Sequence, residues 1–182
     1  MEEKKQMIDK NYLIVGKQSF DSSHEVANLI HYVTRTGNCK KNVEDCICYG
    51  GHGVSISDSI GLAIEQFKGI YGAYKAPRKG CRRQAYHEQM EIPYEYARRM
   101  SPEDMDELAY WLSYHYWNRR YPVIYAVHGP GKSGRHFHIH FVVSMVSCRT
   151  GKKFDTSGKE NRIRMQLFNR LMEAFVEMRG LR

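Results

Sequence analysis

Hydrophobic residues recur at intervals of three and four along four stretches of the sequence, and this spacing predicts amphipathic helices. The four predicted helices cover approximately residues 24–34, 58–71, 101–118 and 160–179. The third has the clearest beginning, because Ser101 can cap it while Glu103 and Asp104 oppose the helix dipole. The first is expected to turn its apolar side, which carries Val26 and Ile30, towards the core.

Runs of β-branched and aromatic residues predict strands between these helices. The predicted strands cover residues 12–15, 84–92, 121–128 and 136–146. The last two are separated by the glycine-containing stretch 129–135, which predicts a hairpin with a mobile tip. Residues 38–56 contain glycines and cysteines without a clear period, so we expect them to be irregular. An adjacent strand pair among scattered helices predicts an α+β fold with a mainly antiparallel central sheet flanked by helices.

Composition narrows the class of protein. A length of 182 residues fits a single domain with its own core. The net charge of +8 suits a polyanionic partner, because lysine and arginine gain affinity by displacing the counterions of phosphates. The sequence has no long apolar run and no secretory signal. We therefore expect a cytoplasmic protein without membrane insertion, whose five cysteines are free thiols.

Histidine alternates with large apolar residues over residues 136–141, in the last predicted strand. Because successive side chains of a strand point to opposite faces, His136, His138 and His140 share one face while the apolar residues can pack on helices. His128, at the end of the preceding strand, can close a site with them. Three neutral imidazoles with positions left open suit a catalytic divalent metal such as Zn²⁺, Mn²⁺, Ni²⁺ or Mg²⁺, which could polarise a phosphate oxygen. The alternative is a chance run of histidines on a solvated face.

These residues resemble a known family. The segment His138-Ile139-His140 resembles the HUH signature of two histidines around a bulky apolar residue, and His128 lies where relaxases carry their third histidine. From about residue 10 to residue 180 the chain is similar to the relaxase/mobilisation nuclease family of the HUH endonuclease superfamily. The resemblance implies that His128, His138 and His140 bind the metal. It also implies a single relaxase domain over residues 1–182, which is compatible with the N-terminal part of a longer protein.

Relaxases of this group carry a single tyrosine nucleophile on or near the first helix, and residues 31–35, His-Tyr-Val-Thr-Arg, resemble that motif best. The resemblance therefore implies Tyr32 as the nucleophile, with Tyr12 as the alternative, and Arg35 as a phosphate contact or a helix cap. The implied activity is the nicking of one DNA strand at an origin of transfer by metal-assisted transesterification, through a 5′-phosphotyrosine link. This activity would mobilise a plasmid, transposon or integrative element. The implied partners are single-stranded DNA, accessory mobilisation proteins and a coupling protein.

The sequence departs from relaxases where they often carry an acid shortly after the first histidine, because residues 129–131 read Gly-Pro-Gly. Glu91, on the same face of the 84–92 strand as His87 and Gln89, is therefore our candidate for orienting a ligand histidine, with a plain surface acid as the alternative. Further DNA contacts are expected from His136, Lys132, Arg135 and the basic stretch 75–83.

Three other functions remain open from the sequence. A rolling-circle replication initiator or a single-strand transposase would share the histidine pair but place its tyrosine after it, and no tyrosine follows Tyr125. A non-catalytic nucleic-acid-binding module would use the histidines for a structural metal or for none. A hydrolytic metalloenzyme would act on a small phosphorylated substrate.

Overall fold

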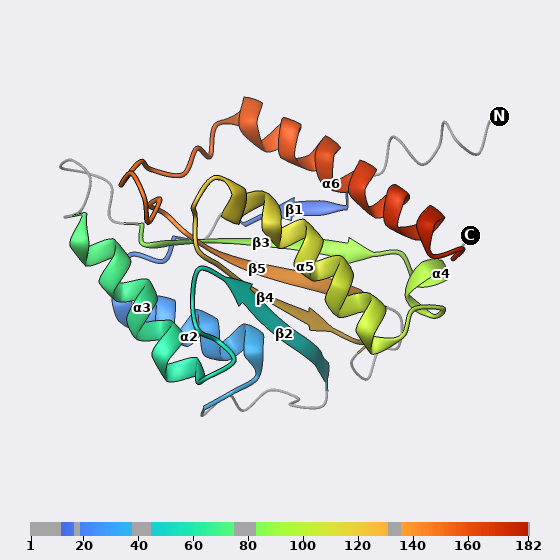
Figure 1. Ribbon diagram of the computed structural model, residues 1–182, viewed down its shortest axis with the longest axis horizontal. Coiled ribbons are helices and arrows are strands. Elements are labelled where there is room, and N and C mark those ends of the chain that lie inside the picture. The colour runs from blue at the N-terminus through green and yellow to red at the C-terminus, as the bar shows by residue number, and fades with distance from the viewer. Residues whose placement is uncertain (1–11, 17–18, 38–44, 75–82, 131–135, 182) are drawn as a thin grey trace.

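A five-stranded sheet with helices on both faces forms the core of the computed structural model, which describes residues 12–16, 19–37, 45–74, 83–130 and 136–181 (Figure 1). The strand order is β1-β3-β5-β4-β2, and all neighbours are antiparallel. The strands are β1 (Leu13–Val15), β2 (Cys46–His52), β3 (Ala85–Ile92), β4 (Val123–His128) and β5 (Phe137–Ser144). The helices are α2 (Ser23–Thr34), α3 (Ile60–Ala73), α4 (Tyr94–Ala97), α5 (Pro102–Asn118) and α6 (Gly158–Met178). The predicted α+β fold with an antiparallel sheet is confirmed.

The two faces of the sheet pack against different helices, as Figure 1 shows. On one face, Phe141 of β5 lies in the larger hydrophobic cluster with residues of α5 and α6. On the other face, Ala126 of β4 and Val142 of β5 pack in a smaller cluster with residues of α2 and α3. Because His128 and His140 alternate in step with Ala126 and Val142, the histidine face of the sheet is the one that α2 covers.

A buried ion pair joins the larger cluster to β3. Arg164 of α6 donates from Nη2 to Oε1 of Glu88 at 2.6 Å, and both side chains are almost fully buried. The hydroxyl of Tyr116 on α5 donates to the same carboxylate. Glu88 therefore links α5 and α6 to the face of β3 that points away from the histidines.

The helices predicted by periodicity are all present, each within two residues of its expected start. Ser101 caps α5 as expected, since its hydroxyl accepts the backbone N–H of Asp104 and the Asp104 side chain reaches back to the N–H of Ser101. The expected pairing of the last two strands is also found, with His128 opposite His138 in the register. Most of the expected mobile tip, residues 131–135, lies outside the described residues.

The prediction that residues 38–56 are irregular is wrong for β2. This edge strand pairs only with β4, and its register shifts between Cys46 and Cys48. Its sequence lacks a clear alternation, and Gly50 leaves space for the Tyr125 hydroxyl, which a Cβ would meet. Pairing with β4, not local sequence preference, therefore establishes the strand. Among the described cysteines, Cys46, Cys48 and Cys148 are free thiols, and no described helix is long and apolar enough to cross a membrane.

Candidate active site

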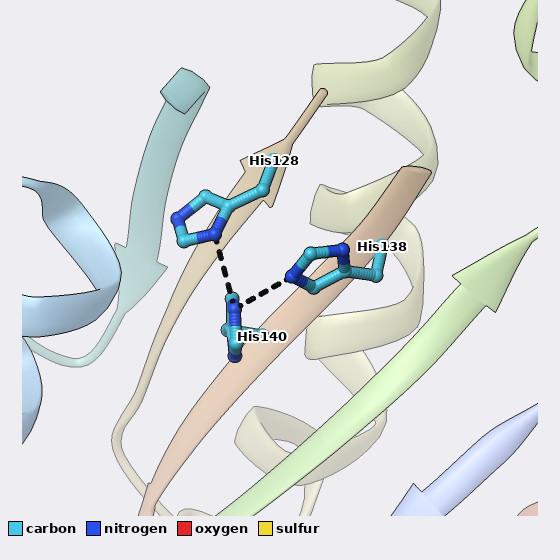
Figure 2. Close-up of side chains that lie close together, drawn as sticks. All are labelled: His128, His138 and His140. Carbon is cyan, nitrogen blue, oxygen red and sulfur yellow. Dashed lines mark hydrogen bonds between the residues drawn. The ribbon is translucent and has the colours of Figure 1, made fainter. Parts of the chain in front are cut away.

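Three histidines from two neighbouring strands converge on the α2 side of the sheet (Figure 2). His128 ends β4, while His138 and His140 lie two residues apart on β5. Nε2 of His140 is 3.1 Å from Nδ1 of His128 and 3.0 Å from Nε2 of His138. One ring nitrogen from each residue lies within 4.8 Å of the other two. The structure thus brings together the three histidines that the sequence singled out.

The three imidazoles are kept neutral by their surroundings. Burial lowers the pKa of His128 to about 4 and also lowers the pKa of His138. The pKa of His140 is lowered furthest, chiefly by burial and then by the nearby His128 and His138. A neutral imidazole offers the lone pair that a metal requires, so the cluster has the protonation state of a ligand set.

The spacing of these nitrogens also fits a divalent cation. Two nitrogens at about 2.1 Å from one metal and at right angles to each other are about 3.0 Å apart. The separations of 3.0 and 3.1 Å from His140 Nε2 agree with that arrangement. Imidazole donors suit nickel or zinc, and three protein ligands leave positions for a substrate oxygen.

The orientation of His128 is set by helix α2. Nε2 of His128 donates to the main-chain carbonyl oxygen of Val33 at 2.6 Å. A carbonyl oxygen can only accept, so the proton resides on Nε2 and the lone pair of Nδ1 points into the cluster. A backbone group of α2 therefore selects the tautomer that a metal site needs.

His140 is held from the opposite side by two residues of β3. Its Nδ1 lies 2.9 Å from Nε2 of His87 and 3.1 Å from the side-chain nitrogen of Gln89. The rings of His87 and His140 are nearly parallel, at 14° and 5.1 Å between centroids. Burial lowers the pKa of His87 to about 4, so this imidazole is neutral and its Nε2 can accept a hydrogen bond from Nδ1–H of His140. That arrangement leaves Nε2 of His140 free to bind a metal.

Glu91 does not make the contact that the sequence suggested. Its side chain is about half exposed, and the carboxylate lies 3.8 Å from Nδ1 of His136. Within the described residues it forms no hydrogen bond with His128, His138 or His140. Glu91 does face the histidine side, opposite His138 in the register, but the β3 side chains that reach a candidate ligand are His87 and Gln89.

Tyr32 lies on α2 beside the histidines. Its ring meets that of His140 edge to face, with 6.0 Å between centroids. The buried neighbours Ile30 and Val33 press α2 onto the sheet, and this packing leaves Tyr32 half-buried at the border of the site. Tyr12, the alternative nucleophile, is buried in the larger cluster on the other face of the sheet. Of these two tyrosines, only Tyr32 is beside the candidate metal ligands.

Arg35 ends α2 in the left-handed conformation, with φ 54° and ψ 34°. Its guanidinium forms two hydrogen bonds with the carboxylate of Asp45, at 2.7 and 2.9 Å, and lies 4.7 Å from the ring centre of Tyr32. Its Nη2 is also 3.3 Å from Nδ1 of His128. These hydrogen bonds hold the pKa of Asp45 below its usual range. The side chain of Arg35 is only 6% exposed, so a direct phosphate contact requires the ion pair to open.

The remaining sequence candidates lie at the edge of the site or beyond the described residues. His136 is exposed at the start of β5, near Glu91. Lys132 and Arg135 lie outside the described residues, as do residues 75–82 of the basic stretch. Sequence reasoning missed Asp45, because it precedes the strand that was expected to be irregular. It placed His87 and Gln89 on the correct face without assigning them a partner.

Solved structures that resemble this fold include relaxases. One is the MobM relaxase domain bound to plasmid pMV158 oriT DNA, a Mn-bound crystal structure; it is 11% identical, with 90% of this chain and 86% of that chain covered and a TM-score of 0.59. Another is the conjugative relaxase TrwC in complex with oriT DNA, also metal-bound; it is 11% identical, with 92% and 70% covered and a TM-score of 0.55. At this level of identity the likeness establishes the fold.

Family membership comes from the sequence match. No curated protein sequence matches the chain significantly. The nuclease domain of MobA/VirD2-like relaxases, however, matches residues 32–175, which is most of the chain and includes Tyr32 and all three clustered histidines. The chain therefore belongs to the MobA/VirD2-like relaxases, DNA-cleaving transesterases of the HUH endonuclease superfamily.

Proposed function

We propose that this domain nicks one DNA strand at an origin of transfer by transesterification onto Tyr32, and so mobilises a plasmid or integrative element. The proposal is carried by the edge-to-face contact between the rings of Tyr32 and His140. His140 is one of the three clustered histidines, with His128 and His138. The proposed nucleophile and the proposed metal ligands thus adjoin on one face of the sheet.

The three histidines would hold a divalent metal ion, with His87 and Gln89 orienting His140. When bound there, the cation would polarise a non-bridging oxygen of the scissile phosphate and offset the charge of the transition state. His128 keeps its Nδ1 lone pair directed into the site because its proton stays on Nε2, which donates a hydrogen bond to the carbonyl oxygen of Val33. In the proposed reaction, the surrounding residues therefore keep the imidazoles of His128 and His140 neutral and in fixed tautomers.

In the proposed reaction the phenol oxygen of Tyr32 forms a bond to phosphorus and the bond from phosphorus to the 3′-oxygen breaks. The phenol proton is lost to solvent, and the departing oxygen takes up a proton to become a free 3′-hydroxyl. The product is a 5′-phosphotyrosine, and because one phosphodiester replaces another the same site can reseal the strand. Arg35, held by Asp45, lies over the Tyr32 ring and steadies it.

The proposed substrate is single-stranded DNA at an origin of transfer; MobM and TrwC, which share the fold, are both bound to oriT DNA in their crystal structures. His136, Lys132 and Arg135 remain proposed DNA contacts, with Arg35 joining them if its pair with Asp45 opens. Accessory mobilisation proteins and a coupling protein are the proposed partners in the cytoplasm. The excess of positive charge in the chain, +8, favours such a polyanionic substrate.

The test is covalent capture. The protein would be incubated with Mn²⁺ and a pool of single-stranded oligonucleotides, denatured, and digested for mass spectrometry. We expect a DNA-linked peptide that contains residue 32, its loss in Tyr32→Phe, and its loss when a chelator removes the metal. Tyr12→Phe is the matched control and should keep the adduct, because Tyr12 lies in the core on the other face.

An adduct that persists in Tyr32→Phe would refute the nucleophile assignment. DNA binding without any adduct in the unaltered protein would favour the non-catalytic binding module instead.

A further inference from the structure

A pocket of about 530 Å³ adjoins the site. It lies between α2 and β3 and shares three residues with the active site, Tyr32, His87 and Gln89. Its volume is within the range of roughly 300 to 1,000 Å³ that is usual for pockets that take small ligands or single chemical groups. A group bound there would lie next to the nucleophile.

The lining of the pocket is suited to a flat, uncharged ring. Phe20 and Leu29 contribute buried apolar surface, and Ile14 is an exposed apolar side chain at the border. The described residues that line it include one acid, Glu25, and neither lysine nor arginine. The Glu25 carboxylate accepts the backbone N–H groups of Asp21 and Ser22 and so stays negatively charged. The negative charge of Glu25 disfavours a phosphate in this pocket, whereas it does not repel an uncharged nucleobase.

Two carboxamides add directional contacts to that lining. The side-chain nitrogen of Asn28 contacts Nε2 of His24 at 3.0 Å, and that of Gln89 contacts Nδ1 of His140 at 3.1 Å. Among the residues that the structure describes, neither carboxamide oxygen has a hydrogen-bond partner. The Asn28 oxygen can thus accept a hydrogen bond from a ligand, whereas the Gln89 carboxamide is committed to His140.

We propose that this pocket binds the base of the nucleotide next to the scissile phosphate and selects a base with an exocyclic amino group. Adenine, cytosine and guanine each present an exocyclic amino group that can donate to the Asn28 oxygen, whereas thymine can donate only through its ring N3–H, which is flanked by two carbonyl oxygens that the Asn28 oxygen repels. The proposal rests on the proposed function, because it takes Tyr32 as the point where the strand is cut. It makes the pocket a determinant of nick-site sequence in addition to any contacts elsewhere along the strand.

The experiment uses a randomised single-stranded library with Mn²⁺. Sequencing the protein-linked product and the released product identifies the base on each side of the nick. We expect thymine to be depleted about fivefold or more at one of the two flanking positions, which corresponds to the lower end of discrimination by a base contact. Asn28→Leu should reduce that depletion while adducts still form, because Asn28 is exposed and lies outside the histidine cluster. Asn118→Leu, an exposed asparagine at the end of α5, is the matched control and should leave it unchanged.

A second comparison tests the amino group itself. In the selected sequence, the preferred base is replaced by an analogue that lacks only the exocyclic amino group. Cleavage by the unaltered protein should fall about fivefold, and cleavage by Asn28→Leu should fall less. Equal use of all four bases at both flanking positions, or a depletion that Asn28→Leu does not alter, would overturn the proposal.

The pocket and the proposed function fail in different ways. If the unaltered protein forms no adduct with any oligonucleotide, the nicking function is refuted. Anisotropy measurements with adenine-rich, cytosine-rich and thymine-rich oligonucleotides then test the pocket alone. The pocket would be supported if the thymine-rich strand binds more weakly than the other two and this difference disappears in Asn28→Leu. Equal binding of all three strands by the unaltered protein would overturn it.

Discussion

Replacement of His87 by alanine should weaken metal binding although His87 is not itself a proposed ligand. Its Nε2 is the nearest partner of His140 Nδ1, at 2.9 Å, and the lost contact frees the His140 ring to rotate and to change tautomer. Loss of such a partner typically lowers metal affinity about 10- to 100-fold. This corresponds to about 1.4 to 2.7 kcal/mol in binding free energy.

The structure indicates where in that range each variant should fall. The side-chain nitrogen of Gln89 also contacts His140 Nδ1, at 3.1 Å, and the carboxamide can turn so that its oxygen accepts the hydrogen bond from Nδ1. We therefore expect about a 10-fold loss for His87→Ala and closer to 100-fold for His87→Ala combined with Gln89→Leu. His87→Asn should recover part of the affinity, because its carboxamide oxygen can accept from His140 as the imidazole does.

The assay is calorimetric titration of the metal-free protein with Mn²⁺, with thermal unfolding of each variant followed by circular dichroism. Glu91→Ala is the control, since Glu91 lies on the same strand and face but contacts His136. Unchanged Mn²⁺ affinity in the double variant, while the fold is retained, would refute the reasoning. An equal loss in Glu91→Ala would refute it as well.

Three further predictions concern stability. Glu88→Gln should destabilise the fold by about 3 to 5 kcal/mol in chemical denaturation, because Arg164 is left buried without its counter-charge; a loss below about 1 kcal/mol would contradict this. Burial lowers the pKa of His115 from its ordinary 6.5 to about 4. The stability that the neutral buried imidazole contributes is therefore complete above pH 6.5 and is lost as the pH falls towards 4, because the unfolded chain binds the proton first. The melting temperature of His115→Gln should accordingly fall less over that interval than that of the unaltered protein, and equal slopes would argue against the assignment. Gly53→Ala should destabilise by about 1 to 2 kcal/mol, because Gly53 has φ +74° and a Cβ there would meet the ring of Trp117; an unchanged melting temperature would count against it.

The elements that the sequence predicts well have strong local signals. Helix α5 has a capping box at Ser101, and β5 alternates histidine with apolar residues, so both follow from short stretches of the chain. Strand β2 has no comparable signal, because its glycines and cysteines follow no period and its pairing with β4 is a long-range event. Asp45 was missed for the same reason, since its role depends on where that strand brings it.

Residues of the candidate site likewise fall into those that a local sequence pattern predicts and those that only long-range strand pairing brings into place. The alternation of residues 136–141 was enough to place His138 and His140 on one face. That His87 and Gln89 reach His140 depends on the pairing of β3 with β5, which no local pattern reveals. Tyr32 is one of thirteen tyrosines and was singled out by its resemblance to a family motif, not by periodicity.

The hydrogen bond between His128 and the carbonyl of Val33 has a mechanical consequence. Val33 directly follows Tyr32, so the helix turn that carries the proposed nucleophile also holds one of the three clustered imidazoles through its main chain. A tilt of α2 away from the sheet would stretch that bond and rotate His128 while it withdrew the phenol. The phenol of Tyr32 and the proposed metal ligand His128 would thus move together. A substitution elsewhere on α2 that loosens the helix would displace both at once.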